Sequence, residues 1–408
     1  MSSPVLFEVL STASRKKIAV ATLNRPEVLN GLSLEVCRML DEQLRQWEFD
    51  TSIALVVLKG AGGKAFCAGG DLHSLYRAMQ ENISGRPWDN LYAREFFEVE
   101  YRLDYLIHQY AKPVLCWGDG IVMGGGVGLM MGASHRVVTE TTRFAMPEIT
   151  IGFFPDVGGS WMLERLPGGI GLFLALTGAQ LGAADCRYLG LADYYLESGA
   201  WPAVQLDLQA RAWSSVRDEN DIRLDQALRA LRPAGQLAAG PLQSRHGLIS
   251  EQCEGPDFDA ICANVAAWAD AADPWLATAA RTFLHGSPGS ARLGFALQQA
   301  ARGMSLAQVF QMEYTAALEC AVMGDFKEGI RALLVDKDKQ PRWSPASIAG
   351  ASSEWVRRFF AAGPPQGSAP PAKYSPLGGQ QAEGAAWGRS VLSAWPDTEP
   401  HPLADLGN

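Results

Sequence analysis

A run of six apolar residues, Ile53 to Leu58, constrains the fold of this chain more than any other feature. A strand that is apolar on both faces has to be covered on both faces, which is the normal situation in a parallel sheet. The run follows an amphipathic helical pattern that starts behind a serine N-cap at Ser33 and repeats apolar side chains from Cys37 to Trp47. Another strand-like run, Ile18 to Leu23, precedes the helix. Strand, helix and strand in this order predict a crossover unit of an α/β fold.

The pattern recurs further along the chain and then changes. A helical stretch at 94–109 leads to a strand at 113–117, a glycine-rich turn at 124–128 and another strand at 135–140. We therefore predict an α/β core over residues 1–200. Alanine-rich, tryptophan-punctuated sequence predicts a mostly helical region over 201–362 that completes or covers the site. The residues 363–408 are rich in proline and glycine and predict a flexible tail.

Composition and charge exclude several classes of protein. The 408 residues carry 35 Lys and Arg against 44 Asp and Glu, and the resulting net charge of −9 disfavours nucleic acid as a partner. No apolar run approaches the ~18 residues of a membrane span. The seven cysteines are an odd number without a C-x-x-C pair, which indicates reduced thiols. We therefore expect no nucleic-acid or membrane partner and a cytoplasmic location, or the mitochondrial matrix if the source is eukaryotic.

Two glycine-rich segments follow predicted strands. The first contains Gly69 and Gly70 directly before Asp71, and the second contains Gly124, Gly125 and Gly126. Glycines at the end of a buried strand free backbone N–H groups to face a ligand. At a helix start, the unpaired N–H groups and the positive end of the helix dipole suit a developing oxyanion. The structural alternatives are an ordinary tight turn for the first segment and close helix packing for the second.

A third segment, Phe144 to Gly159, carries two acids among mostly apolar residues. Glu148 and Asp156 lie eight residues apart in this segment. Acids are seldom placed in such surroundings unless they are paired or functional. Apolar surroundings raise the pKa of a carboxyl group, which suits acid–base catalysis. Salt bridges or helix caps are the structural alternative.

The sequence lacks the motifs of several nucleophile and cofactor classes. Walker A, G-x-G-x-x-G and H-E-x-x-H sequences are absent, and the six histidines show no metal-ligand spacing. The residues around Ser160 lack the final glycine of a G-x-S-x-G nucleophile elbow. We therefore expect neither a metal nor a cofactor.

Taken together, the segments resemble the crotonase (enoyl-CoA hydratase/isomerase) superfamily. The matching motifs are Asn24-Arg25-Pro26 with Leu29-Asn30, Ala65 to Leu72, Lys112-Pro113 and Gly124-Gly125-Gly126. The resemblance implies a crotonase-like spiral of ββα repeats with a C-terminal helical region, and an acyl-CoA substrate whose thioester carbonyl is held by two backbone N–H groups. CoA is then part of the substrate. The implied oxyanion donors are Ala68 and Gly125, and the implied substrate-binding residues beside them are Gly69, Gly70, Asp71 and Gly124.

Within the superfamily, the chain is most similar to the 3-hydroxyisobutyryl-CoA hydrolase branch, which acts in valine breakdown. The segments that follow the pattern of that branch are Met123–Leu129, Phe144–Glu148, Gly152–Gly159, Leu174–Gly178 and Asp325–Ala332, the last continuing through Asp336–Asp338 to Pro341 and Trp343. Hydratases of the superfamily hold water between two glutamates, and this chain has Gly128 at the first of those positions. The resemblance implies Glu148 and Asp156 as catalytic residues and Glu100 as a substrate-binding acid.

The implied reaction is hydrolysis of a 3-hydroxyacyl-CoA thioester, most closely 3-hydroxyisobutyryl-CoA. The resemblance leaves open whether Glu148 is a nucleophile that forms a mixed anhydride or a general base for water. Asp156 and Glu100 are implied to bind the 3-hydroxyl group and to move a proton. The alternative functions are an enoyl-CoA hydratase or isomerase that uses Glu148 alone, and a non-catalytic crotonase-fold scaffold. A homo-oligomer is expected only by analogy with the superfamily.

Overall fold

Two units, each assembled from three separate segments of chain, make up the structure. The computed structural model describes residues 3–235 and 237–361, and the tail predicted at 363–408 lies outside them. The first unit comprises the residues up to Gly70, Leu103–Ala145 and Gln180–Ser244; the second comprises Asp71–Arg102, Met146–Ala179 and the described residues from Arg245 on. The boundary predicted at residue 200 does not coincide with these units, because the chain contributes to each of them three times.

All strands of the described residues belong to the first unit. These strands are β1 (Val5–Ser11), β2 (Lys17–Leu23), β3 (Ile53–Gly60), β4 (Ala65–Cys67), β5 (Val114–Gly118), β6 (Ile121–Met123), β7 (His135–Val138), β8 (Arg143–Ala145) and β9 (Tyr194–Tyr195). Its helices are α1 (Leu34–Phe49), α4 (Gly125–Gly132), α7 (Ala183–Tyr188), α8 (Trp201–Ala210) and α9 (Arg217–Ala230), with short 3₁₀ helices η1 (Pro26–Val28) and η4 (Ser198–Ala200). Ser33 caps α1 as predicted, because its hydroxyl accepts a hydrogen bond from the Val36 N–H.

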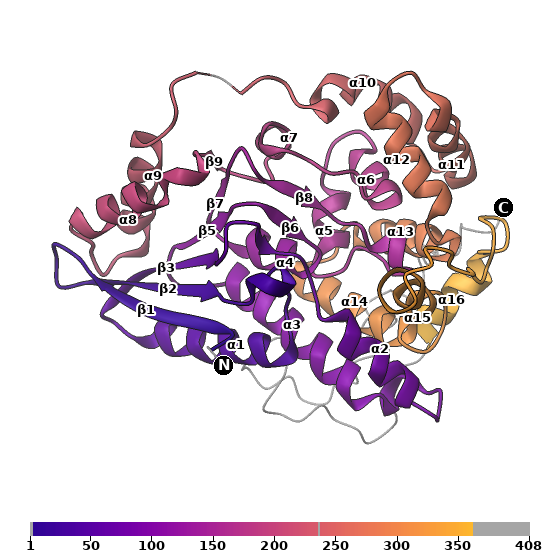
Figure 1. The fold of residues 1–408 in the computed structure, drawn as a ribbon, viewed down its shortest axis with the longest axis horizontal. Helices are drawn as coiled ribbons and strands as arrows, with labels where there is room; N and C mark the ends of the chain where they lie inside the picture. Colours follow the sequence, from indigo (N-terminus) through magenta and orange to yellow (C-terminus); the bar gives the residue numbers. More distant parts are fainter. Residues whose placement is uncertain (1–2, 236, 362–408) are drawn as a thin grey trace. The chain divides into compact units, whose positions relative to one another are not determined.

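The larger sheet has the strand order β1-β2-β3-β5-β7-β9 (Figure 1). β1 is an antiparallel edge strand that pairs with β2 from Val5 opposite Leu23 to Ser11 opposite Lys17. All other neighbours in this sheet are parallel. The residues Ile53–Leu58 of β3 are buried throughout, as their apolar sequence predicts.

Three strands of three residues each form a second parallel sheet, in the order β4-β6-β8. Along the chain, β3 is followed by β4, β5 by β6 and β7 by β8, and a helical segment follows each pair: α2 (Leu72–Glu81), α4 and η3 (Glu148–Ile151). Successive turns stack, because β3, β5 and β7 are neighbours in one sheet and β4, β6 and β8 in the other. This is the predicted ββα spiral. No sequence pattern predicts the short strands, because three residues are too few to show an alternation.

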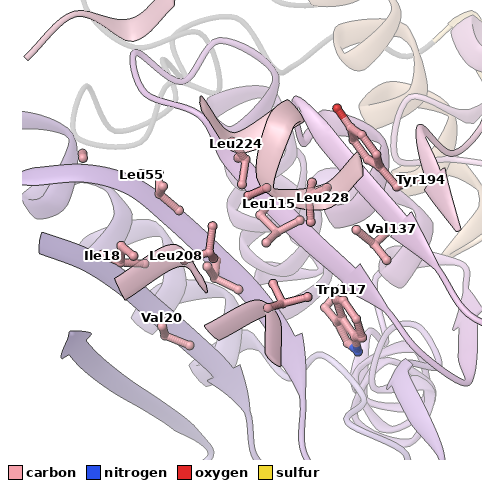
Figure 2. Packing of buried hydrophobic residues seen from close by; sticks show 14 of the residues in the cluster. Ile18, Val20, Leu55, Leu115, Trp117, Val137, Tyr194, Leu208, Leu224 and Leu228 are labelled. Atoms are coloured by element: carbon pink, nitrogen blue, oxygen red, sulfur yellow. The ribbon is translucent and has the colours of Figure 1, made fainter. Parts of the chain in front are cut away.

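Helices α8 and α9 cover one face of the larger sheet. Figure 2 shows the packed side chains, which include Ile18, Val20, Leu55, Leu115, Trp117 and Val137 from the strands and Leu208, Leu224 and Leu228 from the two helices. Side chains alternate between the faces of a strand, so Phe7, which pairs with Ala21, points to the face opposite Val20. There it meets Trp47 of α1 edge to face, with ring centroids 5.5 Å apart. Covered on both faces, the sheet is a rigid support for the loops at its strand ends.

The second unit is helical in its described residues. Its helices are α2, α5 (Gly159–Glu164), α6 (Ile170–Thr177), α11 (Phe258–Ala267), α12 (Pro274–His285), α13 (Pro288–Ala301), α14 (Leu306–Cys320), α15 (Phe326–Ile330) and α16 (Ser353–Ala361), with 3₁₀ helices η2 (Pro87–Asp89), η3 and η5 (Trp268–Asp270) and a π-helical turn at Arg331–Val335. Two helices, α3 (Leu91–His108) and α10 (Pro241–Cys253), begin in one unit and end in the other. The helical character predicted beyond residue 200 is therefore found.

Candidate active site

The two glycine-rich segments come together in the first unit. A Cβ atom built on Gly69 would lie 3.7 Å from the backbone nitrogen of Gly125 and 3.8 Å from the Cα of Gly124. Gly126 has no room for a side chain, because a Cβ there would lie 2.3 Å from the carbonyl oxygen of Cys67. Gly125 opens α4, and the N–H groups of a first helical turn have no acceptor within their helix. Backbone N–H groups of both segments therefore gather at the start of α4.

Ala68, one of the two expected oxyanion donors, already uses its N–H group. That N–H donates to the carbonyl oxygen of Leu29 at 3.1 Å, and the N–H of Gly69 donates to the Sγ of Cys67 at 3.5 Å. Within the described residues, the N–H groups of Gly70 and Gly125 donate to no backbone acceptor outside their own elements. The structure therefore contradicts Ala68 as an oxyanion donor, because its N–H group already has an acceptor, and leaves the N–H group of Gly70 open in the same segment.

The loop from Asn24 to Asn30 shapes the first glycine segment. Nδ2 of Asn30 donates to the carbonyl oxygen of Ala65 at 2.8 Å, and its Oδ1 accepts from the Arg25 N–H at 2.9 Å. Asn30 is buried, and its backbone is left-handed, with a φ of 57°. These bonds tie the loop to β4 and bring the Leu29 carbonyl to Ala68. The Asn-Arg-Pro motif thus acts through backbone geometry rather than through direct chemistry.

The three acids expected from the sequence lie together in the second unit. Glu100 is on α3, Glu148 opens η3, and Asp156 lies in the turn before α5. They are only 2%, 5% and 6% exposed, respectively. Ionisable side chains are almost never buried this deeply unless they are paired or functional.

Asp156 is held by a tyrosine, whereas its neighbours have open hydrogen-bonding positions. The hydroxyl of Tyr101 donates to Oδ2 of Asp156 at 2.7 Å. Within residues 3–235 and 237–361, Oε1 of Glu100 and Oε2 of Glu148 are buried without a hydrogen-bond partner. A buried polar atom without a partner is costly and rare in native proteins. These two oxygens are therefore the atoms of the cluster that a polar ligand can satisfy.

Burial raises the pKa of all three carboxyl groups. Loss of water is the largest cause for each, and the charge of Asp156 raises the pKa of Glu100 and of Glu148 further. The hydrogen bond from Tyr101 acts in the opposite direction on the pKa of Asp156. Acids that interact this strongly do not all ionise at neutral pH.

Aromatic rings supply the apolar surroundings of this cluster. Phe153 stacks on Phe154 with ring centroids 4.6 Å apart and on Phe97 at 5.8 Å. Phe97 in turn lies 5.7 Å from the ring of Tyr101. These rings belong to the segments that carry the acids, so the same sequence that supplies the carboxyl groups also removes water from them.

The downstream segment Asp325–Ala332 supports the turn that carries Glu148. Gly152, which ends η3 with a φ of 70°, lies so close to this segment that a Cβ would be 2.3 Å from the carbonyl oxygen of Asp325. The Asp325 carboxylate accepts a hydrogen bond from the Ser287 hydroxyl at 2.6 Å. The similarity found this far along the chain therefore reflects a structural contact that sets the position of η3.

Asp71, expected as a substrate-binding residue, is the N-cap of α2. Its Oδ1 accepts from the Ser74 N–H at 3.2 Å, and its Oδ2 accepts from the Ser74 hydroxyl at 3.0 Å. Both carboxylate oxygens thus have partners within their own helix, as is typical of an aspartate N-cap. The geometry assigns Asp71 to helix capping and gives no support to a direct contact with substrate.

A surface cavity of about 420 Å³ lies beside η3 in the second unit. Its polar lining consists of Thr150 of η3, Lys339, and Thr278, Arg281, Thr282 and His285 from one stripe of α12. Three of these side chains are basic or can become so, and no carboxylate belongs to the lining. The rest of the lining is apolar, so the cavity combines a mostly apolar wall with a few basic side chains.

The residues that the structure describes include no cluster of metal-binding side chains. No group of three His, Cys, Asp or Glu side chains among them could hold a metal ion. No helix within the same residues is both long and apolar enough to cross a membrane. All seven cysteines are buried. The expectation of a cofactor-free protein stays a prediction.

The ββα spiral, with glycine loops at the start of α4, defines the class of this protein. A family model described as "Enoyl-CoA hydratase/isomerase" matches residues 18–360, and the chain belongs to this family. It is similar to the 3-hydroxyisobutyryl-CoA hydrolase, mitochondrial, of Danio rerio, with 38% identity over 361 residues that cover 88% of this chain and 89% of the relative. The protein of the same name from Homo sapiens is 35% identical over 343 residues, which cover 84% of this chain and 85% of the relative.

Solved structures confirm the predicted crotonase-like fold. An enoyl-CoA hydratase from Rhodobacter sphaeroides has a TM-score of 0.75 and 31% identity, covering 88% of this chain and 97% of that one. A carnitinyl-CoA dehydratase from Mycobacterium thermoresistibile has a TM-score of 0.77 and 34% identity, covering 90% and 100%. The names of the curated relatives place them in mitochondria, so the expected cytoplasmic location gains no support from them.

Proposed function

We propose that the protein hydrolyses 3-hydroxyisobutyryl-CoA, or a close 3-hydroxyacyl-CoA, to the free acid and CoA. The observation that carries this proposal is the buried cluster of Glu100, Glu148 and Asp156, with its two unpartnered carboxyl oxygens among the described residues. The names of the curated relatives support the same reaction. A place in valine breakdown and a location in the mitochondrial matrix belong to this proposal, and the word mitochondrial in the relatives' names supports the location.

In the proposed reaction, two backbone N–H groups stabilise the negative charge that develops on the thioester oxygen, as the resemblance to the superfamily implies. The carboxylate of Glu148 either attacks the carbonyl carbon or removes a proton from a water molecule that does so. The C–S bond then breaks, and the CoA sulfur leaves with a proton, which comes from Glu148 on the water route and from Asp156 or Glu100 on the anhydride route. On the anhydride route, water then hydrolyses the mixed anhydride to the free acid and restores Glu148. Both routes require ionised Glu148, and a carboxylate whose pKa is raised by burial is a stronger base than an exposed one.

Asp156 and Glu100 are proposed to recognise the 3-hydroxyl group of the substrate. Oε1 of Glu100 is a buried acceptor without a partner in the described residues, and Oδ2 of the neighbouring Asp156 accepts from the Tyr101 hydroxyl. A hydroxyl group satisfies such an acceptor, whereas an acyl chain without the hydroxyl leaves it unpaired. Sites of this kind reject the analogue lacking the hydroxyl by as much as ~10⁴-fold.

A hydratase is the second candidate, because two similar structures carry hydratase or dehydratase names. Gly128 leaves this chain without the first of the two glutamates that superfamily hydratases use. The products separate the two candidates. We expect release of free thiol from 3-hydroxyisobutyryl-CoA and no loss of the enoyl absorbance of crotonyl-CoA. Loss of the absorbance without thiol release would establish the hydratase instead.

The CoA phosphates are proposed to bind in the cavity beside η3, where Arg281 and Lys339 supply positive charge. We expect the double variant Arg281→Ala with Lys339→Ala to raise the KM for the acyl-CoA about tenfold, because the loss of two phosphate contacts removes roughly 1–2 kcal/mol of binding. The kcat should stay within about twofold. The matching acyl-pantetheine, which lacks the nucleotide, is the control substrate. An equal rise in KM for both substrates would place the phosphates elsewhere.

A further inference from the structure

A fourth buried acid, Glu313, contacts the turn that carries Asp156. Glu313 lies on α14 and is fully buried. Its Oε2 accepts a hydrogen bond from the Gly158 N–H at 2.7 Å, and its Oε1 accepts one from the Ser160 N–H at 2.9 Å. Both carboxylate oxygens are therefore engaged by backbone groups that follow Asp156 directly in the chain.

The turn needs an external contact because its backbone is strained. Val157 has a φ of 53° and Gly158 a φ of 83°, so two consecutive residues adopt left-handed conformations. A β-branched residue in this region costs on the order of 1–3 kcal/mol and persists only where the surroundings hold it. The two hydrogen bonds to Glu313 lie immediately after the strained residue. They are thus placed to keep Asp156 in its observed position.

Helix α14 also contacts the other partner of Asp156. Phe310, one turn before Glu313, lies 5.8 Å from the ring of Tyr101 and packs against Gly158, where a Cβ would be 3.3 Å from its Cζ. Helix α14 therefore contacts both the tyrosine that donates to Asp156 and the turn that carries Asp156, and so fixes the position of each. A shift of α14 would move both together.

The two backbone hydrogen bonds suit Glu313 to a fixed position rather than to proton transfer. Each carboxyl oxygen of Glu313 accepts one backbone N–H group, which fixes the plane of the carboxyl group against the turn. Burial raises the pKa of Glu313 to about 8, and the bonds from Gly158 and Ser160 act against that rise. Neither oxygen is left over for a substrate.

We propose that Glu313 is a positioning residue that holds Asp156 in place for recognition of the substrate hydroxyl group. This inference deepens the proposed function and rests on it. No sequence motif indicates this role for Glu313, because the residue lies on a helix far along the chain from Asp156. The role depends on two hydrogen bonds that exist only in the folded chain.

The test is Glu313→Gln, which keeps the volume but turns one acceptor into an amide donor. We expect kcat/KM for 3-hydroxyisobutyryl-CoA to fall about 100-fold, and that for isobutyryl-CoA, which lacks the hydroxyl, to fall less than fivefold. In an Asp156→Asn background the same change should add less than threefold. Equal losses on both substrates, or losses that multiply in the double variant, would overturn the proposal.

Two further variants separate position from stability. Glu319→Gln alters another buried acid of α14 whose Oε1 has no partner in the described residues, and it should leave both kcat/KM values within about twofold. Glu313→Asp keeps both acceptors on a shorter side chain and should lose less than Glu313→Gln. If Glu313→Gln does not fold, the substrate ratio of Glu313→Asp decides: an unchanged ratio would contradict the proposal.

Amide hydrogen exchange tests the same contact without any catalytic readout. In the unmodified protein we expect slow exchange at Gly158 and Ser160, and exchange at least tenfold faster in Glu313→Gln, with no change at the amides of α13. If the enzyme released no thiol but this exchange pattern held, the proposed function would fail while the contact stood. Unchanged exchange at both amides would reject the positioning role itself.

Discussion

Replacing Glu148 with glutamine should lower kcat for thioester hydrolysis by about 10³-fold or more and leave KM within a few-fold. Glutamine preserves the shape of the side chain but can neither attack the carbonyl carbon nor accept a proton from water, and a positioned base typically contributes 10²–10⁴-fold. The measurement is steady-state release of CoA thiol. A kcat within a factor of five of the unmodified enzyme would remove Glu148 from the mechanism.

The same substitution should stabilise the protein at alkaline pH. The pKa of Glu148 is raised in the folded state, so the stability that its neutral form contributes is present at low pH and is lost as the carboxyl ionises with rising pH. Glutamine has no such ionisation. Thermal unfolding should therefore show Glu148→Gln melting above the unmodified protein at pH 9, with the difference shrinking toward pH 5.

A matched control for Glu148 is available on α3. Glu98 is also buried, and burial raises its pKa to about 7, but it belongs to the neighbourhood of Arg94 and Arg102 rather than to the cluster around Asp156. Glu98→Gln should keep kcat within about twofold. A loss as large as that of Glu148→Gln would show that removal of any buried acid in this unit disturbs the site.

Replacing Asp156 with asparagine should reduce kcat/KM for 3-hydroxyisobutyryl-CoA by about 10²–10³-fold but that for isobutyryl-CoA by less than tenfold. Asparagine can still accept the Tyr101 hydroxyl through its oxygen, and its NH₂ group then takes the place of the carboxyl oxygen that we propose accepts from the substrate hydroxyl. The substrate hydroxyl would then face a donor instead of an acceptor. It would lose its hydrogen bond, and the free energy of removing it from water would no longer be offset. The informative quantity is the ratio of kcat/KM for the two substrates.

Tyr101→Phe is a milder change to the same group and gives a reference for the loss seen in Asp156→Asn. It removes the hydrogen bond to Oδ2 but keeps the carboxylate and the ring packing against Phe310. We expect a smaller loss, about tenfold, in the same substrate ratio. If Asp156→Asn lowered activity on both substrates equally, Asp156 would serve the reaction itself rather than recognition of the hydroxyl group.

The α/β class of the fold and two of the three acids, Glu148 and Asp156, could be predicted from local signals in the sequence, whereas Glu100 and the spiral were implied only by the resemblance to the superfamily. The apolar run of β3 and the periodicity of α1 indicate buried strands and an amphipathic helix wherever they occur. An acid among apolar residues indicates a raised pKa from the amino-acid order alone, and the pKa values of Glu148 and Asp156 are raised as expected. The second sheet gave no such signal, because each of its strands has three residues.

The order of amino acids specifies which chemical groups are available: the glycines that open α4, the acids of the buried cluster and the apolar residues that dehydrate them. Which of these groups are free to act depends on how the chain folds. The fold paired the N–H of Ala68 with Leu29 and left that of Gly70 open, turned Asp71 into a helix cap, and brought Glu313 to the turn of Asp156. The physical reason is that a side chain's chemistry is local, whereas the partner of a hydrogen-bonding group is chosen by whatever the fold places within about 3 Å of it.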